Sequence, residues 1–95
     1  MPFAVITTTN ARRDIQTAID WENSRSPNLG TRFLEYLHLK FTSLSFTPFI
    51  GSTRYENVRC TTTDVFQYLI HYTVDVDSQR VTILRVLHTK QKPIW

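Results

Sequence analysis

The hydrophobic pattern of this 95-residue chain changes its period near Gly51, and that change limits the folds open to it. Before Gly51, apolar residues recur every three or four positions, as on one face of an α-helix; after it they alternate, as along a β-strand. A chain of this length suits one domain with one modest core. The pattern therefore predicts a single α+β domain over residues 1–95, with its helices ahead of most of its sheet.

Two consecutive helices are predicted before Gly51. The first covers about residues 11–24 and is capped by Thr9-Asn10, because side-chain oxygens there accept free backbone N–H groups. Asp14 is expected in its first turn, where a negative charge favours the helix dipole. The second helix starts after Asn28 and ends before Pro48, since proline disfavours a helical residue ahead of it. Its apolar stripe comprises Leu29, Phe33, Leu37, Phe41 and Leu44.

Strands are predicted on both sides of this helical hairpin. A short β-branched run over residues 3–8 precedes it, and strands over 54–62, 65–75 and 81–89 follow it. The short connections between the last three imply an antiparallel meander in one twisted sheet. Val81–Thr89 is apolar on both faces in its middle, which places it inside the sheet rather than at an edge.

Several classes of protein do not fit the chain. It has no run of about 18 apolar residues, so no membrane span is expected, and its N-terminus lacks the pattern of a signal peptide. Its single cysteine, Cys60, makes no internal disulfide, which favours a reducing cytoplasm. Cys60, His71 and His88 lie on three different predicted strands without paired ligand spacing, so no metal site is expected. With only Gly30 and Gly51 there is no glycine-rich phosphate loop, and no cofactor is expected.

Positive charge collects at the end of the chain. Residues 78–95 hold four basic side chains and no acidic one, namely Arg80, Arg85, Lys90 and Lys92. One interpretation is a solvated edge strand and tail; the other is a surface for an acidic partner or a phosphate backbone.

Three side chains near this end have two interpretations each. Arg85 interrupts an apolar run, so it either forms a structural ion pair or faces an open cleft. His88 has the opposite strand parity to Arg85 and is either a proton carrier or a structural residue. Trp95 is either a core plug or a stacking platform.

Three motifs follow one another along the chain: Asp14-Ile15 in the first helix, Asn-Leu-Gly-x-Arg-Phe at 28–33 and His-Thr-x-x-x-Pro at 88–93. In this order they resemble the RelE/ParE superfamily of bacterial toxins from type II toxin–antitoxin pairs, over nearly the whole chain. The resemblance implies a strand, a helical hairpin and an antiparallel sheet. It also implies a cognate antitoxin whose C-terminal segment wraps the toxin, with a hetero-oligomer as one form.

The resemblance leaves two toxic activities to weigh. Ribosome-dependent members cut mRNA with basic residues and a tyrosine on the open sheet face, whereas gyrase-poisoning members look alike without known hydrolysis. Arg59 matches a basic strand position of the RNA-cutting pattern, and Lys92 falls near its last-strand arginine. However, residues 46–53 contain no lysine, and no tyrosine follows the final strand.

The leading hypothesis is therefore a ParE-like toxin that binds DNA gyrase and is neutralised by its antitoxin. The alternatives are a RelE-like mRNA interferase acting on the ribosome and mRNA, and a non-toxic partner-binding member. For the interferase, the candidate catalytic residues are Arg59, Arg85, His88 and Lys92. The candidate partner-binding residues are Phe33, Leu37, Lys90 and Trp95.

Overall fold

One five-stranded sheet organises the molecule in this computed structural model, which describes residues 2–90. The strands are β1 (Ala4–Thr7), β2 (Ser52–Tyr55), β3 (Val58–Thr62), β4 (Tyr68–Asp75) and β5 (Arg80–His88). Their order across the sheet is β1-β5-β4-β3-β2. β1 runs parallel to β5, and the other neighbours are antiparallel. The prediction that the last strand lies inside the sheet is confirmed, because β5 pairs on both sides.

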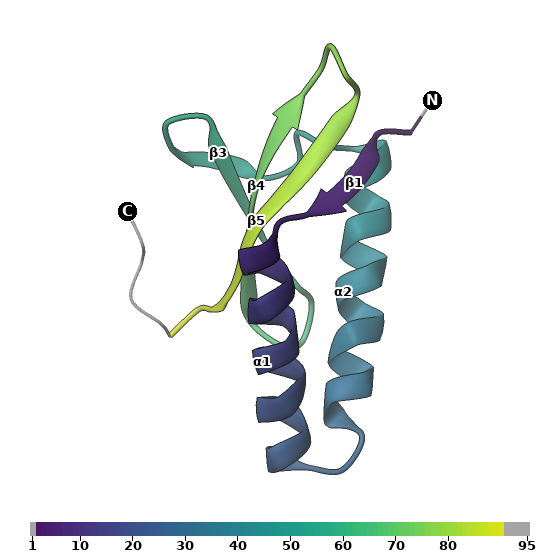
Figure 1. Cartoon of the computed structure of the whole chain (residues 1–95), viewed down its shortest axis with the longest axis vertical. Coiled ribbons are helices and arrows are strands. Elements are labelled where there is room, and N and C mark those ends of the chain that lie inside the picture. Colours follow the sequence, from purple (N-terminus) through teal and green to yellow (C-terminus); the bar gives the residue numbers. More distant parts are fainter. Residues whose placement is uncertain (1, 91–95) are drawn as a thin grey trace.

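Two antiparallel helices, α1 (Thr9–Arg25) and α2 (Leu29–Phe46), cover one face of this sheet. Figure 1 shows that the hairpin is offset from the sheet, so that its loop end projects past the strands. The core between the two layers contains completely buried residues from α2, β4 and β5: Phe33, Leu37, Leu44, Ile70, Tyr72, Val81 and Ile83. The predicted α+β class, helical hairpin and antiparallel meander are therefore confirmed. Within residues 2–90, neither helix is long and apolar enough to cross a membrane.

The meander has one strand more than predicted. The run over residues 54–62 is divided into β2 and β3 by a turn at Glu56-Asn57, where Glu56 adopts a φ of 46°. β4 begins at Tyr68 rather than at residue 65, since Val65 and Gln67 also have positive φ values that a strand does not accommodate. An alternating hydrophobic pattern surrounds both turns, so the sequence alone does not separate the turn residues from the strands.

The first helix starts two residues earlier than predicted. Thr8 is its N-cap, and the Thr8 hydroxyl accepts a hydrogen bond from the Ala11 N–H at 3.1 Å. Asp14 consequently lies beyond the first turn, and its carboxylate does not act as a helix-dipole partner there.

Close packing of the two helices depends on Gly30. A Cβ at this position would come within 2.5 Å of the Ile19 carbonyl oxygen. The Asn23 side chain in α1 accepts a hydrogen bond from the Gly30 N–H at 2.8 Å, so α1 caps the start of α2. Gly30 thus lies in the first turn of α2, where a larger residue would push the helices apart.

The other end of the hairpin is fastened to the sheet by a buried tyrosine. The Tyr72 hydroxyl donates to the Pro48 carbonyl at 2.8 Å and accepts from the Gly51 N–H at 2.9 Å. These bonds hold the loop that leads from α2 into β2 against the middle of β4.

Candidate functional site

A pocket of about 990 Å³ lies where the helical hairpin extends past the sheet. Its walls come from both helices, from the β3–β4 loop and from the end of β5. Five aromatic side chains are part of this lining: Trp21, Tyr36, Phe66, Tyr68 and His88. At its mouth Trp21 is 57% and Val65 is 74% exposed, so a partner can reach this apolar surface.

A buried carboxylate lies in the wall of this pocket. Glu22 is only 1% exposed, and it accepts hydrogen bonds from the Tyr68 hydroxyl at 3.0 Å and from Arg25 Nη1 at 3.1 Å. Burial, and then the hydrogen bond to Glu22, raise the pKa of Tyr68 well above its ordinary value. The phenol therefore stays protonated and donates to the carboxylate.

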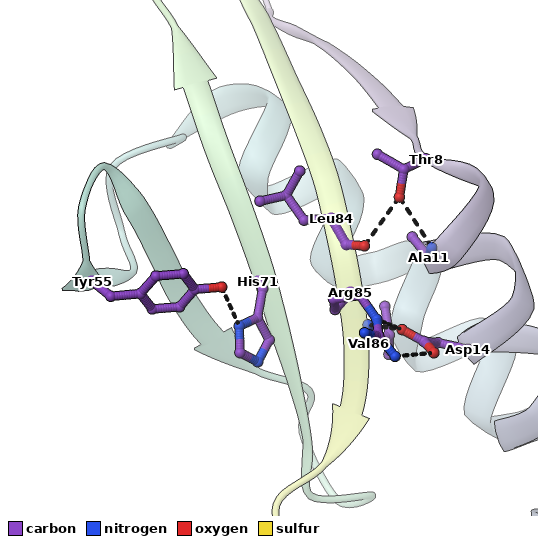
Figure 2. Close-up of polar contacts among 8 residues, drawn as sticks. All are labelled: Thr8, Ala11, Asp14, Tyr55, His71, Leu84, Arg85 and Val86. Carbon is purple, nitrogen blue, oxygen red and sulfur yellow. Dashed lines mark hydrogen bonds and ion pairs between the residues drawn. The ribbon is translucent and has the colours of Figure 1, made fainter. Parts of the chain in front are cut away.

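A second carboxylate joins α1 to β5 at the pocket edge (Figure 2). Asp14 accepts two hydrogen bonds from Arg85, at 2.7 Å from Nε and 3.0 Å from Nη2, and a third from the Val86 N–H at 3.0 Å. This hydrogen bonding to Asp14 raises the pKa of Arg85 further above its already high value. Of the two interpretations of Arg85, the structural ion pair is the one that the geometry supports.

β5 accommodates Arg85 through a bulge. Arg85 lies opposite His71 and Ile83 lies opposite Tyr72, so Leu84 is an extra residue without a counterpart in β4. Both Ile83 and Val86 consequently face the core, while Leu84 and Arg85 between them point away from it. A charge within an apolar run thus avoids the core.

His88 lines the pocket on the opposite sheet face to Arg85, as its parity predicts. It lies across from Tyr68, with ring centroids 5.2 Å apart at 83°, and its Nδ1 accepts from the Lys90 N–H at 3.1 Å. Through these contacts His88 packs against β4 and binds the backbone just after β5, which favours its interpretation as a structural residue.

The candidate catalytic residues that the structure describes do not converge. Arg59 lies opposite Tyr72, whose side chain faces the core, whereas Arg85 lies opposite His71 on the other face. Arg59 donates to the Gly51 carbonyl at 2.8 Å and covers the Phe49 ring at 4.9 Å. Its role here is to hold the loop before β2. Lys92, the fourth candidate, lies outside the described residues.

The sheet face away from the helices carries a separate polar cluster. His71 Nδ1 lies 3.4 Å from the Tyr55 hydroxyl and 3.6 Å from Cys60 Sγ. Burial, followed by the nearby Arg85 charge, lowers the pKa of His71, and burial raises the pKa of the Cys60 thiol. The pair therefore rests as neutral imidazole and thiol, which is the unreactive state of a Cys–His pair.

The partner-binding predictions are partly corrected. Phe33 and Leu37 are completely buried between α2 and the sheet, so they serve the core and offer no surface to a partner. Both lie on the apolar stripe, which sequence alone does not divide into core and docking positions. Lys90 is exposed and lines the pocket, and Trp95 lies outside the described residues.

The pocket residues Trp21, Glu22 and Tyr36 were not predicted as site residues. One signal was available for Glu22, because it continues the apolar stripe of Ile15 and Ala18 at helical spacing, and a carboxylate there needs a buried partner. Trp21 and Tyr36 carry no such signal, since their place depends on how far the hairpin outruns the sheet. Within residues 2–90, no three metal-binding side chains gather in one place.

Comparison with known families gives one match over nearly the whole chain. Residues 5–93 match the family model described as the ParE toxin of the type II toxin–antitoxin system parDE. This chain belongs to the ParE toxin family. Among curated proteins, no sequence matches it significantly.

Solved structures share the fold of this ParE-family chain. A chain of the chromosomal ParDE toxin–antitoxin system from P. aeruginosa superposes with a TM-score of 0.79 at 15% identity, covering 93% of this chain and 97% of the other. A chain of the toxin–antitoxin complex RelBE2 from Mycobacterium tuberculosis gives 0.65 at 26% identity, with 96% and 95% covered. A chain of the archaeal RelE–RelB complex from Pyrococcus horikoshii gives 0.56 at 15% identity, with 97% and 100% covered. The predicted RelE/ParE resemblance is confirmed.

Proposed function

We propose that this chain is the toxin of a type II toxin–antitoxin pair, that it acts by binding DNA gyrase, and that its antitoxin occupies the pocket at the loop end of the hairpin. The observation that carries the proposal is an accessible aromatic pocket in a chain of the ParE toxin family. The similar solved structures come from toxin–antitoxin complexes, which supports an antitoxin as the partner.

The pocket supports a protein partner better than a chemical reaction. Its two carboxylates are already engaged, Asp14 by Arg85 and Glu22 by Tyr68 and Arg25. Its accessible surface includes the Trp21 ring, and large aromatic side chains dominate the energetics of protein interfaces.

Gyrase is favoured over the ribosome as the target by the positions of the arginines. An interferase needs cations that converge on one scissile phosphate. Arg59 and Arg85 face opposite sides of the sheet, and each is held by a protein oxygen.

Two activity assays test the target. Purified protein is added to a gyrase supercoiling reaction and, in parallel, to a translating extract whose mRNA ends are mapped. Inhibited supercoiling with intact mRNA supports the proposal. Cleavage at ribosomal A-site codons would contradict it and support the mRNA interferase. If the protein neither inhibits supercoiling nor cleaves mRNA, the result would contradict the proposal and favour a non-toxic partner-binding protein.

A matched pair of variants tests the antitoxin site. Trp21 and Phe46 are both exposed aromatic residues on the hairpin, 57% and 69%, but only Trp21 lines the pocket. Trp21→Ala is expected to weaken binding of the antitoxin from the adjacent gene by about 2 kcal/mol, as for an interface hot spot. Phe46→Ala is expected to leave calorimetric affinity unchanged, and equal losses for both variants would place the antitoxin elsewhere.

A further inference from the structure

The aromatic walls of the pocket support one another before any partner binds. Phe66 lies 5.7 Å from Phe33 and 5.7 Å from Tyr36, measured between ring centroids, and Tyr68 lies 4.6 Å from Phe33. Contacts of this kind fix the orientation of each ring. The pocket therefore presents a preformed surface suited to a planar apolar group.

Most of the charge around the pocket is neutralised internally. Asp14 pairs with Arg85, and Glu22 pairs with Arg25. Two further cations at the lining, Arg32 on α2 and Lys90 after β5, form no ion pair with another residue in the part of the chain that the structure describes. Their charges give the mouth a local positive potential without an internal counterion.

This arrangement selects the sign of charge on an occupant. A cation would meet Arg32 and Lys90 and would find Glu22 buried and already hydrogen-bonded by Tyr68. A carboxylate would be attracted by the charges of Arg32 and Lys90, neither of which forms an ion pair within residues 2–90. Opposite charge at the edge of an apolar contact favours both encounter and correct orientation.

From these contacts we infer that the pocket recognises an aromatic side chain accompanied by a carboxylate, with Arg32 and Lys90 as the residues that select the acid. The inference rests on the proposed function for the identity of the partner, which is an antitoxin segment with an aromatic residue beside Asp or Glu. The recognition chemistry itself depends only on this pocket.

Three small probes with one ring system test that chemistry. Indole-3-propionate, indole-3-propionamide and tryptamine carry a negative, a neutral and a positive group on the same indole. Each is titrated into the full-length protein, and the backbone amide NMR signals of Val65 and Gln67 in the pocket wall are followed. The propionate is expected to bind roughly threefold to tenfold more tightly than the amide, as for one or two solvent-exposed charge contacts, and tryptamine is expected to bind most weakly.

Charge variants assign the preference to its residues. Arg32→Gln together with Lys90→Gln is expected to reduce the propionate affinity to that of the amide. Lys40→Gln is the matched control, because Lys40 lies on the same helix outside the pocket. Equal affinities for propionate and amide, tighter binding of tryptamine, or no shift of the pocket signals with any probe would each overturn the inference.

The antitoxin separates this inference from the proposed function. If the antitoxin of the adjacent gene fails to bind while the propionate preference is present, the proposed function is wrong and the pocket chemistry stands. If the antitoxin binds at Trp21 but the probes show no preference for the acid, the inference is wrong and the proposed function stands.

Discussion

The two ends of the helical hairpin are built differently although they belong to the same two helices. At the end where α2 meets the sheet, Leu44 is fully buried and Tyr72 ties the following loop to β4 through two hydrogen bonds. At the loop end the helices outrun the sheet (Figure 1), and the rings of Trp21 and Tyr36 line a pocket instead of a core. Both ends thus contribute buried residues to the core, but the loop end also leaves an accessible surface around Trp21.

The largest expected effect comes from replacing one side chain at each end of the hairpin by alanine. Leu44→Ala is expected to lower the free energy of unfolding by about 2–5 kcal/mol, because it leaves a cavity in a fully buried site. Tyr36→Ala is expected to change it by less than half as much, since Tyr36 is only partly buried at the pocket wall. Urea unfolding monitored by circular dichroism measures both values, and a greater loss for Tyr36→Ala would contradict the contrast.

The ion pair between α1 and β5 fastens the hairpin to the sheet, and its removal is expected to have the next largest effect. Asp14→Asn weakens two hydrogen bonds from Arg85 and one from Val86, with an expected loss of about 1.5–3 kcal/mol, as for bonds to a charged group. Asp20→Asn on the same helix is the control, since Asp20 is exposed and its carboxylate accepts one hydrogen bond, from the neighbouring Gln16 side chain. Equal melting temperatures for wild type and Asp14→Asn would show that this junction contributes nothing.

The two buried tyrosine hydroxyls give a finer comparison. Tyr72→Phe leaves the Gly51 N–H and the Pro48 carbonyl without their partner, and a loss of about 1–3 kcal/mol is expected. Tyr68→Phe removes one of two bonds to Glu22, while Arg25 continues to donate. We expect Tyr68→Phe to cost less than Tyr72→Phe in urea unfolding, and the reverse order would show that the pocket wall is the more tightly built region.

The smallest expected effect is a pH dependence from the opposite sheet face. Burial lowers the folded-state pKa of His71 below its ordinary value of 6.5. The unfolded chain therefore binds a proton first as the pH falls, so this contribution to stability is complete above about pH 6.5 and is lost progressively below it. His71→Gln is expected to reduce the fall in melting temperature between pH 7.5 and pH 5.5. His38→Gln, at an exposed site on α2, is the control, and an identical fall in wild type and His71→Gln would contradict this assignment.

Much of the fold could be predicted because its signals are local. The stripe of Phe33, Leu37 and Leu44 and the alternation of Tyr68, Ile70 and Tyr72 each identify a buried face without reference to the rest of the chain. The turn at Glu56-Asn57 was missed because an unbroken strand fits the same residues equally well. The parallel pairing of β1 with β5 depends on contacts more than seventy residues apart, and no local pattern specifies it.

The site was harder to predict because it depends on partners in space. Arg59 and Arg85 look alike in sequence, but Arg59 binds a loop carbonyl, whereas Arg85 starts from the opposite strand parity and binds Asp14 of α1. Phe33 and Tyr36 are neighbours on α2. Which of them lies in the core and which lines the pocket depends on where the sheet packs against the helix.

The contacts of α1 with β5 also affect how the protein behaves in crowded solution. β1 ends at Thr7, so the adjacent edge of β5 would offer its backbone groups to any passing strand. Instead, the Thr8 hydroxyl donates to the Leu84 carbonyl at 3.0 Å, and Asp14 accepts from the Val86 N–H. Exposed strand edges template aggregation, and charged side chains at an edge suppress it. These two side chains therefore protect a stretch of β5 from edge-to-edge association during the time that the chain spends without a partner.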